Sequence, residues 1–247
     1  MKKFFTVIGG MGSLATESYV HLLNERTPTK KDQDYLDYIL VNHSTVPDRT
    51  AHILDNSKPS FLPPLVEDIK QQSLLKPEFM VIICNTAHYY YKELQAATDI
   101  PLIHMPHMAI SVMKDKYPNA KKVGLIATKG TIADHVYENE IKEAGFELSL
   151  GDQEVQDQVE SLIYDDIKIK GQVDADKYYD ILKTMHDKFD CDVIVLGCTE
   201  LSYAQEKAPD HPYQVIDGQG IIVDKSIEYS EKIRRGEVID YSKIYSY

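Results

Sequence analysis

Cysteine is scarce, tryptophan is absent and no long apolar run occurs in this chain of 247 residues. The three cysteines are an odd number without the spacing of metal ligands, so we expect neither a disulfide framework nor a metal site. The apolar runs fall well short of a membrane span. The run that follows the N-terminal lysines breaks at Gly9, which is too early for a signal peptide. These absences favour a cytoplasmic protein with free thiols.

Positive charge is also in deficit, with 27 Lys and Arg against 39 Asp and Glu and a net charge of −12. Nucleic acids and anionic membranes bind basic faces, so we expect neither as a partner. An anionic substrate would need cationic side chains at its binding site to offset the repulsion by this net negative charge. The hydrophobic content of 43% supports a substantial core, and the length suits two domains or one large α/β unit.

Short apolar runs alternate with longer amphipathic runs, which is the pattern of parallel sheets with crossover helices. We expect strands at residues 4–8, 38–41, 79–83, 102–104, 122–127, 147–150, 192–196 and 214–216. We expect helices at residues 15–25, 61–75, 87–97, 105–116, 132–144, 153–168, 175–188 and 220–234. The sequence therefore predicts an α/β fold.

The alternation divides into two units. Residues 117–121 form a polar, proline-containing crossing, so the N-terminal α/β domain should cover residues 1–117 and the second α/β domain residues 118–210. Residues 211–247 should return to the first domain, because the last helix needs a sheet to cover.

Two of the three cysteines stand in matching contexts. The stretches MVIICNTAH (80–88) and DVIVLGCTEL (192–201) each run from an apolar strand into a cysteine, with a threonine and a helix start behind it. Cys84 and Cys198 should therefore lie at the carboxyl ends of parallel strands, where open α/β sheets bind ligands. Cysteine is also a common buried apolar residue, but packing alone does not explain one such site in each half. Cys191 precedes its strand and is interpreted as structural.

Facing thiols suit racemisation, which removes a proton from one face of a carbon and returns a proton to the other. One thiol must be ionised, and free cysteine has a pKa of about 8.5, so only a few per cent is thiolate at neutral pH. A helix N-terminus can lower the pKa of a thiol, and its backbone amides can hold a carboxylate.

Candidates for binding an anion follow the first two strands. The turn GGMGSLAT (9–16) formally matches the dinucleotide fingerprint, but the second strand runs into Asn42 and Ser44 without a carboxylate for a ribose. The glycines then serve either a turn that exposes amides to a small anion or a turn for packing only. Asn42 and Ser44 could donate hydrogen bonds, and Arg49 could pair with a substrate carboxylate or with Asp48.

Further polar residues have two interpretations each. Thr128 could contact a ligand or cap the next helix, and Lys168 could bind an anion or interact with the helix dipole. His104 and His107 are separated by a proline and have no acidic neighbour in sequence, so we expect structural roles rather than a metal site. His88 follows Cys84 closely and could reach a cleft.

Six motifs occur in one order from Gly9 to Leu201: GGMGSLAT, VPDRT, CNTAH, ATKGTI, IYDDIK and GCTEL. With these motifs the chain resembles the aspartate racemase branch of the aspartate/glutamate racemase family. The resemblance implies two similar Rossmann-like domains, each with a mainly parallel four-stranded sheet, and an active site in the cleft between them. It also implies racemisation of a small dicarboxylic amino acid without pyridoxal phosphate, metal or another cofactor, and a homodimer.

The resemblance further implies a role for each matching residue. Cys84 and Cys198 would be the acid–base pair, with Cys198 serving L-aspartate and Cys84 serving D-aspartate. Arg49 and Lys168 would bind the side-chain carboxylate, with Lys170 as a competitor of Lys168 because the usual glycine is displaced to Gly171. The residues implied to line the rest of the site are Met11, Asn42, Ser44, Asn85, Thr86, Thr128 and Thr199. Glu200 stands where glutamate racemases carry histidine, which favours aspartate.

Other functions stay open on the sequence alone. A glutamate or broad-specificity racemase, or a decarboxylase or isomerase of the same architecture, would share the fold, although the last two often lack one of the cysteines. A cysteine hydrolase would need a histidine paired with a thiol, for which His88 is the candidate. A non-catalytic small-anion-binding protein would use Arg49 and the glycine turn but gives no reason for matched thiols.

Overall fold

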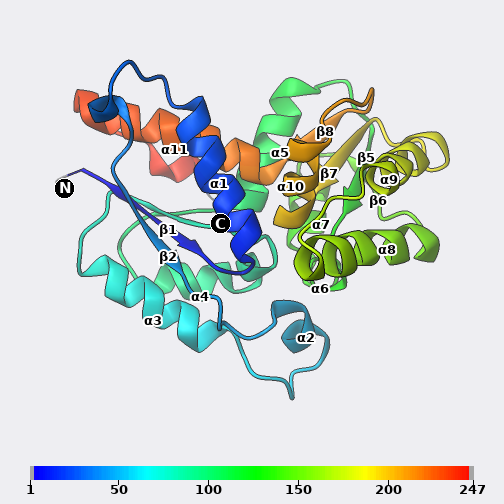
Figure 1. Ribbon diagram of the computed structural model, residues 1–247, viewed down its shortest axis with the longest axis horizontal. Helices are drawn as coiled ribbons and strands as arrows, with labels where there is room; N and C mark the ends of the chain where they lie inside the picture. The colour runs from blue at the N-terminus through cyan, green and yellow to red at the C-terminus, as the bar shows by residue number, and fades with distance from the viewer. Residues whose placement is uncertain (1–2, 245–247) are drawn as a thin grey trace.

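The computed structural model describes residues 3–244, which fold into two α/β units that lie side by side (Figure 1). The first sheet contains β1 (Phe5–Gly9), β2 (Tyr38–Asn42), β3 (Met80–Ile82) and β4 (Leu102–Ile103) in the order β2-β1-β3-β4. The second contains β5 (Lys122–Ile126), β6 (Glu147–Ser149), β7 (Val193–Leu196) and β8 (Val215–Asp217) in the order β6-β5-β7-β8. All the strand pairs given for these sheets are parallel, so the predicted fold of two four-stranded parallel sheets is confirmed.

The strands form where the sequence has short, continuous apolar runs. β1 and β7 occupy inner positions of their sheets and are buried along their whole length, as expected for parallel strands that are covered on both faces. β2 is an edge strand and is only partly buried. The inner strands therefore fix the frame of each unit, and the segments that follow them emerge at the carboxyl edge of each sheet.

Helices connect successive strands. The helices of the first part of the chain are α1 (Ser13–Arg26), α2 (Arg49–Leu54), α3 (Leu62–Ser73), α4 (Tyr91–Ala96) and α5 (Met105–Lys116). Those of the second part are α6 (Lys129–Ala133), α7 (Val136–Glu143), α8 (Gln153–Glu160), α9 (Ala175–Asp187), α10 (Thr199–Lys207) and α11 (Gly218–Arg235). The π-helix η3 (Ser161–Ile169) follows α8, and the 3-10 turns are η1 (Asp32–Asp34), η2 (Thr86–Tyr90) and η4 (Tyr241–Lys243).

Three of the predicted helices differ in detail. The helix expected at 87–97 is the 3-10 turn η2 up to Tyr90 and the α-helix α4 only from Tyr91. The helix expected at 132–144 is divided into α6 and α7 because His135 takes a left-handed conformation with φ of 57°. The helix expected at 153–168 remains an α-helix only to Glu160 and continues as the π-helix η3. Such π-helical turns are rare and occur frequently at functional sites.

Apolar side chains cover both faces of each sheet. In the first unit, α1 and α11 pack on the face that carries Phe5 and Val7, and α3 and α4 pack on the face that carries Ile8. In the second unit, α8, α9 and η3 pack on the face that carries Ile194, and α5 and α7 pack on the opposite face. Each unit is therefore a sheet between two helical layers.

The last part of the chain returns to the first unit later than expected. β8 pairs with β7, with Ile194 opposite Val215, so residues 215–217 belong to the second sheet rather than to the first domain. The apolar Ile216 enters the core under α5, which explains why this strand stays with the second unit. Within this last part of the chain, α11 is the element that packs on the first sheet, through residues such as Ile222 (Figure 1).

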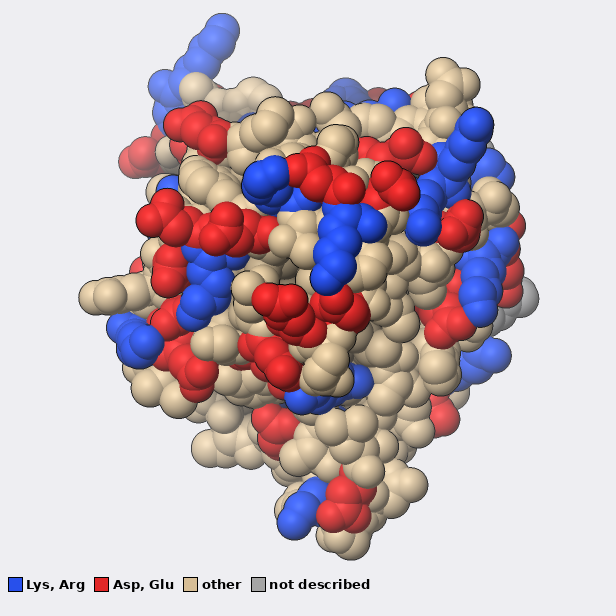
Figure 2. Space-filling model, turned by 90° about the vertical axis from the view of Figure 1, so that its right-hand side faces the viewer, with Lys and Arg blue, Asp and Glu red and all other residues tan. Residues whose placement is uncertain are grey.

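The face formed by the second unit carries acidic and basic side chains next to one another (Figure 2). Ion pairs of the second unit include Lys188 with Asp152 at 2.7 Å and Lys183 with Asp187. The excess of negative charge is thus interspersed with cations on this face. Within residues 3–244, no helix is both long enough and apolar enough to cross a membrane.

Candidate active site

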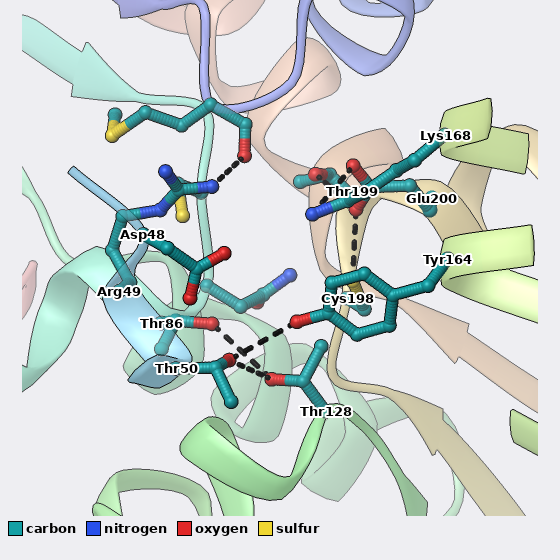
Figure 3. Close-up of a pocket in the computed structure, with 13 residues that line it drawn as sticks. Asp48, Arg49, Thr50, Thr86, Thr128, Tyr164, Lys168, Cys198, Thr199 and Glu200 are labelled. Carbon is teal, nitrogen blue, oxygen red and sulfur yellow. Dashed lines mark hydrogen bonds and ion pairs between the residues drawn. The ribbon is translucent and has the colours of Figure 1, made fainter. Parts of the chain in front are cut away.

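A narrow cavity, partly open to solvent, lies between the two units (Figure 3). Its walls come from the segments that follow β1, β2 and β3 in the first unit and β5 and β7 in the second, together with η3. The lining residues are Met11, Asp48, Arg49, Thr50, Cys84, Asn85, Thr86, Thr128, Tyr164, Lys168, Cys198, Thr199 and Glu200. Both sheets therefore contribute their carboxyl ends to one site, where α/β proteins bind ligands.

Two residues expected at the site do not line this cavity. Asn42 is exposed, and its side-chain oxygen accepts a hydrogen bond from the Ser13 hydroxyl at 3.3 Å. Ser44 lines an adjoining open groove, together with Leu14 and Ile167. The reason is that β2 is an edge strand, and the chain beyond it presents Asp48 to Thr50, rather than its first residues, to the cavity.

The two matched thiols occupy equivalent positions in the two units. Cys84 follows β3 and Cys198 follows β7, and each of these strands is third in the order of its sheet. Both thiols line the cavity, and both residues are buried, with 4% and 6% of their surface exposed. Cys191 lies before β7, in the core of the second unit, where its thiol faces the Phe189 carbonyl oxygen at 3.8 Å. This location agrees with a structural role for Cys191.

Arg49 begins α2 and is oriented by main-chain carbonyl groups. Its guanidinium donates to the Met11 oxygen at 2.8 Å, to the Pro47 oxygen at 3.2 Å and to the Val46 oxygen at 3.4 Å. Asp48 caps the helix by accepting a hydrogen bond from the amide of residue 51. The cation is therefore held beside the glycine turn, on the first-unit side of the cavity (Figure 3).

The charge of Arg49 is favoured by its neighbours. Burial lowers the pKa of Arg49, but the nearby Cys84 thiol, Asp48 and Glu200 outweigh this effect and hold the pKa above its ordinary value. A thiolate on Cys84 would thus have a positive charge next to it.

Lys168 reaches the cavity from the π-helix on the opposite side (Figure 3). Its ammonium lies 4.8 Å from the centre of the Tyr164 ring, a cation–π contact with the residue four positions earlier in η3. Lys170 instead forms an ion pair with Asp166 at 2.7 Å, and 59% of its side chain is exposed. The structure therefore brings Lys168, and not its competitor, to the site.

A carboxylate inside the cavity already contacts both Lys168 and Cys198. The Lys168 ammonium lies 3.5 Å from Oε1 of Glu200, and the Cys198 thiol donates to Oε2 at 2.9 Å. Burial and the Glu200 carboxylate raise the pKa of Cys198 well above its ordinary value, although Lys168 acts in the opposite direction. Cys198 is the N-cap of α10, yet the expected lowering of its pKa by the helix N-terminus is overridden.

Two hydrogen-bond donors on the cavity wall have no partner among the described residues: Nε of Arg49 and Nδ2 of Asn85. The Tyr137 hydroxyl, from α7 of the second unit, donates to Oδ1 of Asn85 at 2.6 Å and so orients this amide. Leaving buried donors unpaired costs about 1–3 kcal/mol each. Two donors that could each be satisfied by an acceptor thus belong to residues of the cavity wall.

Hydroxyl groups from both units meet at another wall of the cavity. Tyr164 donates to Thr50 at 3.3 Å, and Thr50 donates to Thr128 at 3.4 Å (Figure 3). Thr86 shares a hydrogen bond with Thr131 at 2.8 Å. Because Thr50 and Thr86 belong to the first unit and the others to the second, these contacts join the two sides of the site.

At Gly10 the glycine turn serves packing rather than the binding of an anion. Gly10 has φ of 91°, and a Cβ there would lie 2.5 Å from the main-chain nitrogen of His43. Its amide donates to the Thr16 hydroxyl at 2.9 Å and is thus already paired. At Gly12 a Cβ would lie 3.2 Å from Oε1 of Glu200, so this position leaves room for the buried carboxylate.

His88 does not act as the partner of a thiol. Its Nδ1 donates to the Cys84 carbonyl oxygen at 2.9 Å, and its Nε2 accepts from the Met105 amide at 3.2 Å. Burial lowers the pKa of His88 to about 4, so the ring is neutral at physiological pH. Within residues 3–244, no cluster of three or more His, Cys, Asp or Glu side chains could hold a metal ion.

The sequence reasoning missed four lining residues. Asp48 and Thr50 flank Arg49 within VPDRT, and Glu200 lies within GCTEL, so each stood inside a motif already recognised. Tyr164 precedes Lys168 by one helical turn. Position in these motifs could have indicated them, but their orientation depends on the folded structure.

A model of the Asp/Glu/hydantoin racemase family matches residues 8–225 of the chain. The chain belongs to this family. The predicted resemblance is thereby confirmed at the level of the family.

Individual relatives agree with this membership. The broad specificity amino-acid racemase RacX of Bacillus subtilis (strain 168) is 30% identical over 127 residues, which are 51% of this chain and 53% of that protein. The chain thus aligns with about half the length of that relative. The structural alignment with Picrophilus torridus aspartate racemase covers 98% of this chain and 99% of that protein's chain, with a TM-score of 0.79 and 24% identity.

Glutamate racemases share the fold more distantly. The structure of the Francisella tularensis enzyme in complex with D-glutamate covers 95% of this chain and 82% of its own, with a TM-score of 0.61 and 20% identity. At these identities the structural likeness establishes the two-domain fold alone.

Proposed function

We propose that this protein is a cofactor-independent amino-acid racemase that interconverts L- and D-aspartate. The observation that supports the proposal is that one cavity is lined by two thiols, Cys84 and Cys198, from equivalent strand ends of the two units. Arg49 and Lys168 line the same cavity and supply the local cations that an anionic substrate of this acidic chain requires.

The substrate would bind through its two carboxylates. The unpaired Nδ2 of Asn85 and the main-chain amides near the two cysteines would hold the α-carboxylate. Arg49, with its unpaired Nε, would hold the β-carboxylate together with Lys168. This arrangement would place the α-carbon between the thiols, since they lie beside Asn85 and Thr199 in the chain.

The reaction would then be a transfer of two protons. One cysteine, as thiolate, takes the α-proton, and the opposite thiol gives its proton to the other face of the carbon. The α-proton of an amino acid is a weak acid, so the negative charge that develops on the α-carboxylate must be stabilised. Donors aimed at such a charge contribute roughly 3 kcal/mol each, and the Asn85 amide is one such donor.

A second candidate substrate class is favoured by the shape of the entrance. The open groove shares Arg49, Lys168 and Glu200 with the cavity and adds the apolar side chains of Leu14 and Ile167. It could accept a longer or apolar substrate side chain. The partial likeness to a broad specificity racemase supports the same alternative.

One assay tests the proposal and separates these substrates. The purified protein is incubated without added cofactor with each enantiomer of aspartate, glutamate and methionine, and the products are separated on a chiral column. We expect both enantiomers of aspartate to be converted, and conversion of methionine at a similar rate would favour the broad-specificity candidate. Binding of aspartate without conversion of either enantiomer would support a small-anion-binding protein and contradict racemisation. The homodimer implied by the resemblance stays a prediction.

A further inference from the structure

We propose that Glu200 takes up the proton of Cys198 and holds it while Cys198 acts as the base. This inference rests on the proposed racemisation, and it adds a third proton-holding group to the two thiols. Neither the family resemblance nor the predicted roles of the cysteines assigns this part to Glu200.

The contact geometry supports direct transfer. Oε2 of Glu200 accepts the Cys198 thiol at 2.9 Å, and both residues are buried, with 3% and 6% exposed. The same oxygen also faces the Thr199 hydroxyl at 3.4 Å. Gly12, which has no side chain, lies beside the other carboxylate oxygen. The carboxylate is thus held against the sulfur rather than exposed to solvent.

The charges around the sulfur explain why a proton must move. Cys198 interacts with Glu200 on α10, with Lys168 and Tyr164 on η3 and with Tyr137 on α7. A thiolate here would lie beside the Glu200 carboxylate, and like charges this close in a buried site are unfavourable. Lys168 lies 3.5 Å from this carboxylate and Arg49 also interacts with it, but the proposed function assigns both cations to the substrate carboxylate.

Proton transfer within the pair removes this conflict. The S–H bond of Cys198 breaks and an O–H bond forms at Oε2 of Glu200, so the total charge of Lys168, Glu200 and Cys198 does not change. The thiolate then takes the α-proton, while the Cys84 thiol gives its proton to the opposite face and becomes the thiolate beside Arg49. Glu200 stays neutral while the α-proton is transferred, and the enzyme is reset when Glu200 releases its proton to water and Cys84 gains one.

The proposal makes the ionisation of Cys198 insensitive to pH. An internal transfer exchanges no proton with solvent, so the thiolate fraction of Cys198 should be nearly constant around neutral pH. Without the carboxylate the proton must leave to water, and the thiolate fraction should rise about tenfold per pH unit below the pKa of the thiol.

Alkylation of Cys198 tests this without requiring racemase activity. In the full chain with Cys84→Ala and Cys191→Ala, Cys198 is the one remaining cysteine. We expect its iodoacetamide rate to vary less than about threefold between about pH 6 and about pH 8, and to rise about tenfold per unit after Glu200→Gln. Glu206→Gln, on the same helix but outside the cavity, is the matched control and should keep the flat profile.

Kinetics of the otherwise native enzyme provide the second measurement. After Glu200→Gln we expect kcat for the enantiomer attacked by Cys198 to fall about 100-fold at neutral pH and to climb with pH. Glu200→Asp keeps a carboxylate and should restore a flatter profile. If the alkylation rate depends on pH in the same way with and without the Glu200 carboxylate, the proton transfer to Glu200 is overturned and the proposed racemisation is not affected. If the pH dependence does change with the carboxylate but the enzyme racemises no substrate, the proposed function is overturned and the proton transfer from Cys198 to Glu200 remains supported.

Discussion

The Tyr137 hydroxyl should control how the substrate carboxylate binds, although it lies outside the set of lining residues. It donates to Oδ1 of Asn85 at 2.6 Å, and both residues are buried, with 0% and 3% exposed. This bond fixes the orientation of the amide, whose Nδ2 has no partner among the described residues. Tyr137→Phe would remove the hydroxyl and leave Oδ1 unpaired, at a cost of about 1–3 kcal/mol.

The consequence should be visible in kinetics as well as in stability. If the amide loses its orientation, one donor to the α-carboxylate is lost, so we expect kcat/KM for aspartate to fall by about 5- to 150-fold. Thermal unfolding of the same variant should show a modest loss of stability.

Tyr178→Phe is the matched control for this experiment. Tyr178 is also fully buried, and its hydroxyl donates to Gln205 at 2.7 Å, outside the cavity. We expect a similar loss of stability and unchanged kinetics. Equal kinetic effects in the two variants, or an unchanged kcat/KM after Tyr137→Phe, would refute the orienting role.

Three other outcomes follow from the site and its surroundings. Arg49→Ala should raise KM for aspartate about 10-fold or more, because a charge-assisted hydrogen bond contributes about 1.5–3 kcal/mol, and unchanged kinetics would exclude Arg49 from the carboxylate site. Cys84→Ala and Cys198→Ala should each abolish racemisation while Cys191→Ala spares it, and full activity in either of the first two would end the two-thiol account. Burial raises the pKa of Asp134 to about 8, so the unfolded chain loses this proton at lower pH than the folded chain, and stability should fall as pH rises from about 4 to about 8. Asp134→Asn should flatten that dependence in thermal unfolding, and an unchanged pH dependence would argue against a protonated Asp134.

The sequence predicted best those site residues that directly follow a continuous apolar run. Parallel strands that are buried on both faces appear as continuous apolar runs, and a polar or sulfur-containing residue directly after such a run marks the carboxyl edge of the sheet. That is why Cys84 and Cys198 could be placed at one site before the fold was known. Arg49 and Lys168 could be placed because they belong to motifs that occur with the cysteines.

Other features depend on contacts distant in sequence. β8 has a short apolar pattern that fits either sheet, and its pairing with β7 is decided by the core under α5. The π-helix η3 arises in a stretch with ordinary helical periodicity, and its Tyr164 contacts Thr50, more than a hundred residues away. The role of Glu200 could not be read from GCTEL, because only the folded chain shows its carboxylate turned back to the thiol.

The direct test of two thiols acting on opposite faces of one carbon is the fate of the α-hydrogen in deuterated water. L-aspartate is incubated with the enzyme, and the deuterium content of substrate and product is measured at low conversion. The account predicts D-aspartate that carries deuterium at the α-carbon, while the remaining L-aspartate still carries its original hydrogen. A product that retains the original hydrogen would contradict it, because one base would then have moved the same proton from face to face.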